Sequence, residues 1–334
     1  MLADWSPIGQ AALGTLFTWF LTAVGGLCVV LMPLVTSSAS AERKILDACL
    51  GFAAGVMLAA SYWSLLEPAV EMAAANPTYG EHYAWVPPAV GFLAGALFLA
   101  LCDWLLERLG VSDVDSLLVN EGLHVHAKND DDDDDDAVER GDDTAPVRYL
   151  ANDPLRQRRP HGGSAVAAPV VISDAARRRK IEEHKRVMLL VLAVTVHNLP
   201  EGLAVGVGFA SVGKAAGATF ERARNLAIGI GLQNFPEGFA VSMPLYRHGQ
   251  PLWKCVFYGQ LSGMVEPIGG ILGAWAVVHV EPLLPYALAF AAGAMIFVVV
   301  DSIVPEIVAS GNRSVGSWGV VAGFLVMMVM DLSL

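Results

Sequence analysis

Two nine-residue segments in the second half of this 334-residue chain repeat one another. The first reads His197-Asn-Leu-Pro-Glu-Gly-Leu-Ala-Val205, and the second reads Gln233-Asn-Phe-Pro-Glu-Gly-Phe-Ala-Val241. They agree at six positions, which include the proline, the glutamate and the glycine. In each segment the first residue and the glutamate are four apart, so they share one face of a helix. The repeat therefore predicts two helices that present similar polar groups.

The sequence around these segments is typical of a membrane protein. Hydrophobic residues make up 54% of the chain and charged residues only 16%, whereas soluble domains have about 25% charged residues. Eight apolar runs are long enough for the roughly 20-residue helix that crosses a bilayer. They cover residues 9–33, 45–68, 87–109, 187–209, 223–245, 253–280, 283–308 and 314–334. We expect an all-α integral membrane protein of eight transmembrane helices, since hydrocarbon cannot satisfy the backbone of an open sheet or loop.

The charged residues are concentrated in one segment. Residues 110–186 hold 29 of the 54 charged residues, and residues 130–136 are seven consecutive aspartates. We therefore expect transmembrane helices 1–3 in residues 1–109, an acidic and largely disordered cytosolic loop in 110–186, and helices 4–8 with the polar site in 187–334. His124 and His126 lie in this loop, and either a weak cytosolic metal site or a solvated linker explains them. No basic surface is large enough for a nucleic acid, so none is expected as a partner.

The basic residues predict the orientation of the chain. The loops after the odd-numbered spans, with their flanks, carry 18 of the 21 lysines and arginines. The positive-inside rule places these loops in the cytosol and both termini on the opposite side. Asn312 begins the glycosylation sequon Asn-Arg-Ser, and we expect it to stay unmodified because it faces the cytosol.

Helices 1–3 and 6–8 resemble two copies of one unit. The sequence Phe-Ala-Ala-Gly-Val-Met at 52–57 matches Phe-Ala-Ala-Gly-Ala-Met at 290–295. An Ala-Gly pair precedes an aspartate by the same distance in 94–103 and 322–331. The two copies run in opposite directions across the membrane, and such inverted repeats are typical of secondary transporters. The glycines in these helices predict close helix packing.

The repeated motif places charge at membrane depth. Glu201, Glu237 and Glu266 all lie in apolar runs beside a proline, and no intramembrane Lys or Arg is available to pair with them. Such charges are expensive and usually mark a pathway or a bound ion. Three converging carboxylates repel each other unless they are protonated or bind a cation. With His197 they suit zinc and its first-row neighbours, although a Pro-Glu-Gly sequence also suits a helix end.

These motifs resemble the ZIP (Zrt/Irt-like) family of divalent-metal transporters, and stretches 50–66, 223–244 and 260–267 are similar to its GufA-like subgroup. The resemblance implies eight helices, a long cytosolic loop after helix 3, and a binuclear metal site on helices 4–6. Carried over to this chain, the implied ligands are His197, Asn198, Glu201, Gln233, Asn234, Glu237 and Glu266. Many family members have histidine at the position of Gln233, so the resemblance leaves the metal preference open.

Further polar residues suggest a pathway on either side of this site. The candidates are Met57, Ser64, Glu67, Glu71, Asp301 and Glu306. We predict an entrance at Glu67 and Glu71 and an exit at Asp301 and Glu306, with ordinary interfacial carboxylates as the alternative. Met57 is either a soft thioether ligand or a core residue.

The sequence therefore predicts a secondary transporter that moves zinc, or iron, manganese or copper, into the cytosol. The alternatives are a metal-selective channel or a metal sensor. An intramembrane metallohydrolase is disfavoured because Asn198 cannot serve as the general base that such an enzyme needs. We expect no enzyme activity and no cofactor, with Zn²⁺ as the transported substrate. The expected partners are divalent metal ions and the bilayer, a homodimer is left open, and the membrane is the plasma membrane or an endomembrane such as the Golgi.

Overall fold

The computed structural model describes residues 4–36, 38–77, 79–108, 174–214, 217–247 and 249–333. The chain divides into two units, one of residues 1–119 and 185–334 and one of residues 120–184. Of the second unit, only the first turns of a helix that starts at Asp174 are described. The first unit carries both repeated motifs, whereas His124 and His126 lie outside the described residues.

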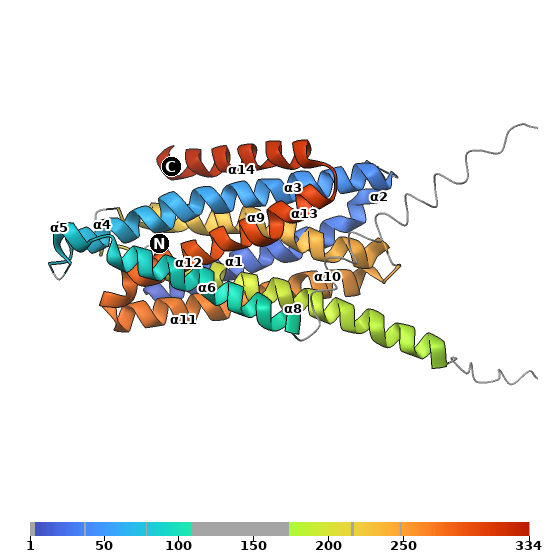
Figure 1. Cartoon of the computed structure of the whole chain (residues 1–334), viewed down its shortest axis with the longest axis horizontal. Coiled ribbons are helices and arrows are strands. Elements are labelled where there is room, and N and C mark those ends of the chain that lie inside the picture. Colours follow the sequence, from blue (N-terminus) through green and yellow to red (C-terminus); the bar gives the residue numbers. More distant parts are fainter. Residues whose placement is uncertain are drawn as a thin grey trace, which may run out of the picture. The chain divides into compact units, whose positions relative to one another are not determined.

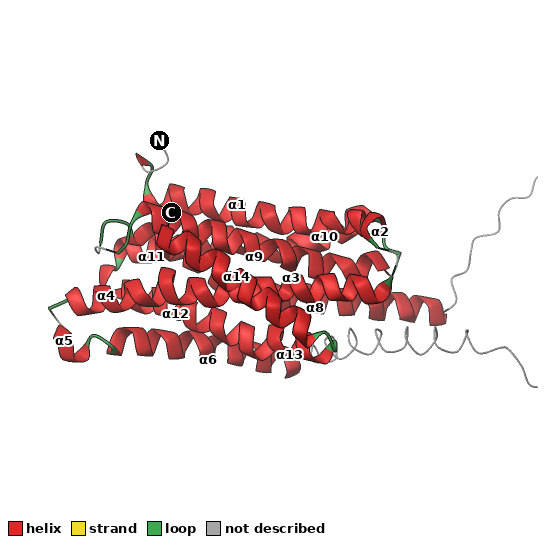
Figure 2. Ribbon diagram, turned by 90° about the horizontal axis from the view of Figure 1, so that it is seen from above, coloured by secondary structure: helices red, strands yellow, loops and turns green. Residues whose placement is uncertain are grey.

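Every regular element in the described part of the chain is helical (Figure 2). The helices are α1 (Pro7–Leu27), α2 (Met32–Val35), α3 (Ala39–Ala60), α4 (Glu67–Ala75), α5 (Gly80–Tyr83), α6 (Val86–Arg108), α8 (Asp174–Ser211), α9 (Phe220–Arg247), α10 (Leu252–Leu261), α11 (Val265–His279), α12 (Leu284–Val298), α13 (Val304–Ala309) and α14 (Arg313–Ser333). Short 3-10 turns lie at Cys28–Leu31, Ser262–Met264 and Glu281–Leu283. The all-α prediction is thus confirmed for the part of the chain that the structure describes.

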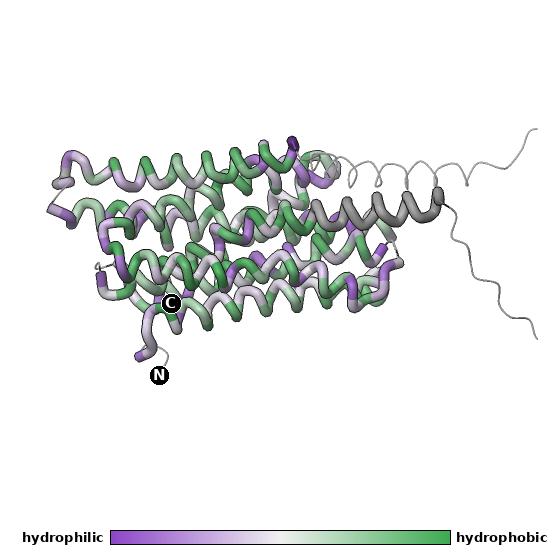
Figure 3. Tube along the Cα trace, turned by 90° about the horizontal axis from the view of Figure 1, so that it is seen from below, coloured by the Kyte–Doolittle hydropathy of each residue, from purple (hydrophilic) through white to green (hydrophobic). Residues whose placement is uncertain are grey.

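Within those residues, seven helical segments are long and apolar enough to cross a membrane. They are Pro7–Val35, Ala39–Ala75, Val86–Arg108, Val191–Ser211, Leu252–His279, Glu281–Ala309 and Arg313–Ser333. Figure 3 shows hydrophobic residues along the lengths of these helices and hydrophilic ones gathered near their ends. The remaining predicted span, the fifth at residues 223–245, corresponds to α9 (Phe220–Arg247), a 28-residue helix whose polar motif lowers its hydropathy. The count of eight therefore stays a prediction.

Glycines allow the helices of the two predicted repeats to approach closely. A β-carbon on Gly51 of α3 would overlap the carbonyl oxygen of Gly316 on α14, and one on Gly95 of α6 would overlap that of Phe290 on α12. The predicted close packing at these glycines is confirmed, because only hydrogen fits at each contact. Helices α3 and α12, which carry the matching sequences, run in opposite directions (Figure 1).

A second set of close contacts joins the helices that carry the polar motifs. A β-carbon on Gly238 of α9 would overlap the carbonyl oxygen of Thr22 on α1. One on Gly202 of α8 would overlap the backbone of Glu266 on α11. The glycine of each Pro-Glu-Gly sequence therefore holds its own helix against a neighbour, one residue away from the glutamate.

Each repeat contains a π-helical turn at the matching place. The turns are Ser61–Leu66, after α3, and Val299–Ile303, after α12. A proline removes the amide that would bond the carbonyl four residues earlier. Pro68 does so for Ser64 and Pro305 does so for Asp301, and both carbonyls lie inside the π-helical turns. Turns of this kind are frequent at functional sites. Ser64 and Asp301, two of the predicted pathway residues, lie within this pair of turns.

Candidate metal site

Helices α8 and α9 position the two repeated motifs. Both helices continue through their motif prolines, Pro200 and Pro236. His197, Asn198 and Glu201 lie on α8, with Gln233, Asn234 and Glu237 on α9. Glu266 is the second residue of α11, directly after the 3-10 turn Ser262–Met264. The close contact of Gly202 with Glu266 brings α8 and α11 together at this level.

Most of these side chains are buried. Glu201 is 1% exposed, Glu266 is 0% exposed, and the three amide residues Asn198, Gln233 and Asn234 are also fully buried. Glu237 and His197 are partly exposed. Glu201 interacts electrostatically with both Glu237 and Glu266. Among the described residues, no Lys or Arg forms an ion pair with these glutamates. Buried carboxylates without a basic partner favour a bound cation.

Several polar atoms at this level have no hydrogen bond to any described residue. They are both carboxylate oxygens of Glu201, both amide atoms of Asn198 and of Gln233, and the amide oxygen of Asn234. Buried polar atoms are nearly always paired in proteins, so atoms such as these indicate a missing partner. Carboxylate and amide oxygens are ligands for divalent cations. The orphaned atoms therefore fit a cation that binds between α8 and α9.

Glu266 differs from Glu201 in that its oxygens are already hydrogen-bonded. The amide of Asn234 donates to Oε2 at 2.8 Å, and the hydroxyl of Thr22 donates to Oε1 at 3.5 Å. The hydroxyl of Thr18 donates a short hydrogen bond to Oε2. The sequence interpretation missed Thr18 and Thr22. The spacing of Thr15, Thr18 and Thr22 in the sequence predicts that they share one helix face, and all three are buried on α1.

His197 has a carboxylate neighbour that the sequence interpretation used only as a repeat marker. Its Nε2 lies 3.4 Å from Oδ1 of Asp103 on α6. Asp331, the corresponding aspartate in the other repeat, accepts a hydrogen bond of 2.8 Å from Ser64. The aspartates that follow the repeated Ala-Gly pair, Asp103 and Asp331, therefore each contact a predicted site or pathway residue.

The described residues hold no group of three or more His, Cys, Asp or Glu side chains close enough to share one ion. The predicted ligands contain three amides, of which that of Gln233 lies beside the Glu201 carboxylate. The binuclear arrangement stays a prediction.

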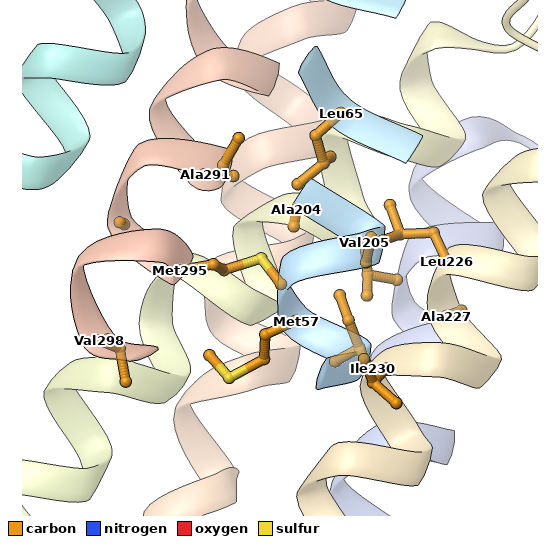
Figure 4. Close-up of a cluster of buried hydrophobic side chains, with 14 of the residues drawn as sticks. Met57, Leu65, Ala204, Val205, Leu226, Ala227, Ile230, Ala291, Met295 and Val298 are labelled. Carbon is orange, nitrogen blue, oxygen red and sulfur yellow. The ribbon is translucent and has the colours of Figure 1, made fainter. Parts of the chain in front are cut away.

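Met57 lies in an apolar layer. It is 1% exposed, and Figure 4 shows it among Met295, Val205, Leu226 and Ile230. This packing agrees with the core interpretation of Met57, while its role as a ligand stays a prediction.

The predicted entrance residues lie at the end of the first unit where both chain termini are found (Figure 1). Asp331 accepts the hydrogen bond from Ser64 and also interacts electrostatically with Arg222 and Glu67. Arg222 forms an ion pair of 3.5 Å with Glu67. The arginine was not among the predicted site residues, because its place at the start of α9 suggested only a basic residue near a membrane surface.

The predicted exit residues lie at the opposite end. Asp301 is exposed in its π-helical turn. Glu306 lies 3.6 Å from Arg43, which also contacts the fully buried Asp47 at 3.3 Å. The side-chain amide of Asn312 donates to Asp47 at 2.8 Å. Glu306 is therefore part of a polar network that ties α3 to the turn before α14, whereas Asp301 is not seen in it.

Together, the long apolar helices and the inverted repeat define a multi-pass membrane protein with carboxylates buried in its Pro-Glu-Gly motifs. The sequence profile of the ZIP zinc transporter family matches residues 10–331. The chain belongs to this family and is a multi-pass integral membrane protein, so the predicted resemblance is confirmed.

Among curated relatives, the chain is 49% identical over 342 residues to zinc transporter ZIP11 of Xenopus tropicalis and 47% identical over 348 residues to zinc transporter ZIP11 of Homo sapiens. Each alignment covers 100% of both chains. Zinc transporter GufA of Myxococcus xanthus is 38% identical over 147 residues, which is 44% of this chain and 56% of GufA.

Proposed function

We propose that this protein transports zinc across a membrane into the cytosol through a site between α8, α9 and α11. The observation that carries the proposal is the carboxylate of Glu201, which is 1% exposed and has neither a basic partner nor a hydrogen bond among the described residues. Its neighbours Glu237 and Glu266 add negative charge. A divalent cation compensates this charge, and the relatives named above are zinc transporters.

The proposed ligands are the seven residues carried over from the family resemblance. His197 supplies the single imidazole. The carboxylate ligands are Glu201, Glu237 and Glu266, and the amide ligands are Asn198, Gln233 and Asn234. Two ions can share this set, which is the binuclear arrangement that the resemblance implies. Zinc is the transported substrate in this proposal and not a resident cofactor, and the protein is a carrier without enzyme activity.

The proposed orientation places both termini outside the cytosol. Two observations support it: the lysines and arginines gather on the loops after the odd-numbered spans, and both termini lie at one end of the first unit in Figure 1 and Figure 2. Both termini can lie on one side of the membrane only if the chain crosses it an even number of times. This favours α9 as a further span beside the other seven. The proposed host membrane is the plasma membrane or an endomembrane.

The test is zinc uptake by the purified protein in liposomes that contain a zinc-sensitive dye. We expect wild type to take up zinc, and we expect Glu201→Gln and Glu237→Gln to lose uptake at least about tenfold, since a neutral amide replaces each carboxylate. Glu221→Gln is the matched control, because Glu221 is exposed on the first turn of α9.

The outcomes separate the function from the site. Absence of zinc uptake by wild type contradicts the function. Normal uptake by the double variant Glu201→Gln/Glu237→Gln contradicts the site alone. Uptake that rises steeply with membrane voltage and does not saturate with zinc indicates a channel and not a carrier.

A further inference from the structure

A cavity of about 340 Å³ lies where α1, α3 and α9 meet. Every side chain that lines it is apolar, since a free cysteine behaves as a small hydrophobe. Six of the seven lining residues are partly exposed, so the cavity opens to the surface of the protein. We name it the α9 groove, and its lining residues are Leu21, Ala48, Cys49, Phe52, Leu232, Phe235 and Pro236.

Helix α9 forms the floor of the groove, and α1 and α3 both pack against it (Figure 1). A β-carbon on Gly25 of α1 would overlap the carbonyl oxygen of Phe235 on α9, so these two backbones touch. A β-carbon on Gly229 of α9 would contact Val56 of α3 at 3.6 Å. The groove is therefore closed by helix packing on its inner side, and a ligand reaches it from the surface.

The surface beside the groove is apolar as well. Phe17, one turn before Leu21 on α1, is 39% exposed, and Phe20 is 61% exposed. Helices α1 and α3 both belong to segments that are long and apolar enough to cross a membrane. The groove thus opens toward lipid chains and not toward water. An empty groove would leave its lining without dispersion contacts, which a lipid chain restores.

The volume of the groove limits what can occupy it. A closed apolar cavity of about 150 Å³ binds benzene, which has six carbon atoms. By the same measure, the 340 Å³ of the α9 groove hold about twelve carbon atoms, which is a large part of one acyl chain. A helix of a second protein copy is about 10–12 Å across with its side chains and does not fit. The size therefore favours a single acyl chain.

A lysine stands at one end of the groove. Lys44, Ala48 and Phe52 are spaced by four residues along α3, so they share one helix face. At 1.5 Å per residue, Lys44 lies about 12 Å from the level of Phe52, toward the start of α3. Lys44 is exposed and forms no ion pair with a described residue. Basic side chains at a membrane surface attract anionic lipid headgroups, so the groove combines an apolar channel with a cation for a phosphate.

We propose that the α9 groove binds one acyl chain of a phospholipid whose phosphate group lies at Lys44. The lipid belongs to the leaflet on the side where α3 begins. This inference goes beyond zinc transport and does not depend on it. Leu232 and Phe235 lie on α9 among the candidate ligands Gln233, Asn234 and Glu237. The bound chain is therefore a packing partner of the segment that carries three of these ligands.

The test is native mass spectrometry of the purified full-length protein in detergent with added phosphatidylglycerol. We expect wild type to retain one molecule of this lipid. In Ala48→Phe the added ring fills the groove, and we expect lipid retention to fall at least about tenfold. Ala94→Phe is the matched control, because Ala94 is exposed on α6, which does not line the groove. This control should retain the lipid as wild type does.

A second pair of variants tests the headgroup contact. Lys44→Gln removes the charge and leaves the apolar lining intact, so we expect retention of phosphatidylglycerol to fall about fivefold, the effect of one basic residue near an anionic lipid surface. Arg313→Gln removes an exposed basic residue at the start of α14 and should have no effect. Equal retention by these two variants would overturn the assigned contact with Lys44.

Cys49 allows the groove to be filled after the protein has folded, which decides the matter if Ala48→Phe does not fold. In a protein with Cys28→Ala, Cys102→Ala and Cys255→Ala, N-benzylmaleimide can react only with Cys49. We expect phosphatidylglycerol to slow this reaction, and we expect the alkylated protein to lose the retained lipid. A protein with Cys102 as its only cysteine is the control, and its alkylation should leave the lipid bound.

Four results would overturn the proposal. The first is a wild-type protein that retains no phospholipid. The second is full retention both by Ala48→Phe and by the protein alkylated at Cys49. The third is retention of an added sterol in place of the phospholipid. The fourth is a dimer that dissociates on alkylation of Cys49, which would assign the groove to a second copy of the chain. Zinc uptake is not measured in these experiments, so a failure of the proposed function would appear separately.

Discussion

The carboxylate of Asp103 on α6 lies 3.4 Å from Nε2 of His197 on α8. This contact joins a helix of the inverted repeat to a helix of the repeated polar motif. Histidines that bind metals usually give their other ring nitrogen to a carboxylate or a carbonyl, which fixes the ring and raises its basicity. With Nε2 facing Asp103, Nδ1 is the nitrogen that remains for an ion.

Asp103→Ala should therefore weaken zinc uptake without removing a ligand. The expected loss is about 10- to 100-fold in apparent zinc affinity, the range for removal of a partner of a ligating histidine. Asp103→Asn keeps an oxygen acceptor and should lose less. Saturation curves for zinc uptake measure the effect. Glu107→Ala is the control, one turn later and exposed on the same helix, and an equal loss in this control would contradict the assigned role of Asp103.

Thr18→Val should change both stability and zinc binding. The substitution removes one donor to the fully buried Glu266. Because Asn234 still donates to the same oxygen, the loss is that of a single hydrogen bond, about 0.5–1.5 kcal/mol. We expect a lower melting temperature and a larger upward shift of that temperature on addition of zinc. Thermal unfolding with and without zinc measures both quantities. Thr195→Val is the control, because the Thr195 hydroxyl donates to a carbonyl of its own helix, that of Val191. A zinc shift in Thr18→Val equal to that of wild type would show that Glu266 does not bind the ion.

Gln233→His should sharpen the preference for zinc over manganese. Gln233 is fully buried with both amide atoms lacking a hydrogen bond to a described residue. An imidazole in its place adds a borderline nitrogen ligand, which favours zinc. We expect the zinc-to-manganese uptake ratio to rise about tenfold, equivalent to ~1.4 kcal/mol of differential binding. Competitive uptake of the two metals in the same vesicles measures this ratio, and an unchanged ratio with equal expression would remove Gln233 from the ligands.

Gly55→Ala should destabilise the packing of α3 against α14. A β-carbon there would overlap the carbonyl oxygen of Val320, so the two backbones must move apart. Overpacking of this kind reduces stability by about 1–3 kcal/mol. The melting temperature of the purified protein in detergent measures the change. Gly208→Ala is the comparison, since its added carbon meets only the end of the Leu226 side chain, at 3.0 Å, and an equal loss in both variants would contradict the argument from backbone contact.

Asn312 should carry no glycan, although it begins a sequon. In the proposed orientation it faces the cytosol, and its side-chain amide already donates to the buried Asp47 at 2.8 Å. The measurement is the mass of the protein from eukaryotic cells before and after glycosidase treatment. A mass shift that Asn312→Gln abolishes would reverse the orientation. Impermeant thiol reagents give an independent answer, since Glu67→Cys should react from outside and Glu306→Cys only from inside.

The apolar runs predicted seven of the spans well because hydropathy over about 20 residues is a local property of the sequence. The predicted run 223–245 corresponds to helix α9, but the residues that form the candidate site lower the mean hydropathy of this helix, so its crossing of the membrane stays a prediction. The repeat predicted the burial of Glu201 at membrane depth for a related reason. Carboxylates are rare in apolar runs, so a motif that places one there twice, at Glu201 and Glu237, indicates a polar site between the two helices.

The contacts of Thr18 and Arg222 could not be predicted in this way. Threonine is common in transmembrane helices, and only the packing of α1 against α11 brings Thr18 to Glu266. Arg222 lies at a helix start, where a basic residue has many uses. Its contact with Glu67 joins residues that are far apart in the sequence. The π-helical turns were also not predicted, although the prolines that favour them were visible.

The hydrogen bonds to Glu266 bear on how long an ion stays bound. An ion that takes both oxygens of Glu266 must replace the donors Asn234, Thr18 and Thr22. The free energy of those lost bonds is subtracted from the binding energy, and most differences in affinity appear in the dissociation rate. Glu201 has the amide of Gln233 beside it but no hydroxyl donors like those of Glu266 among the described residues, so an ion there displaces fewer hydrogen bonds. The two carboxylates should thus differ in residence time, with the ion at Glu266 the first to dissociate.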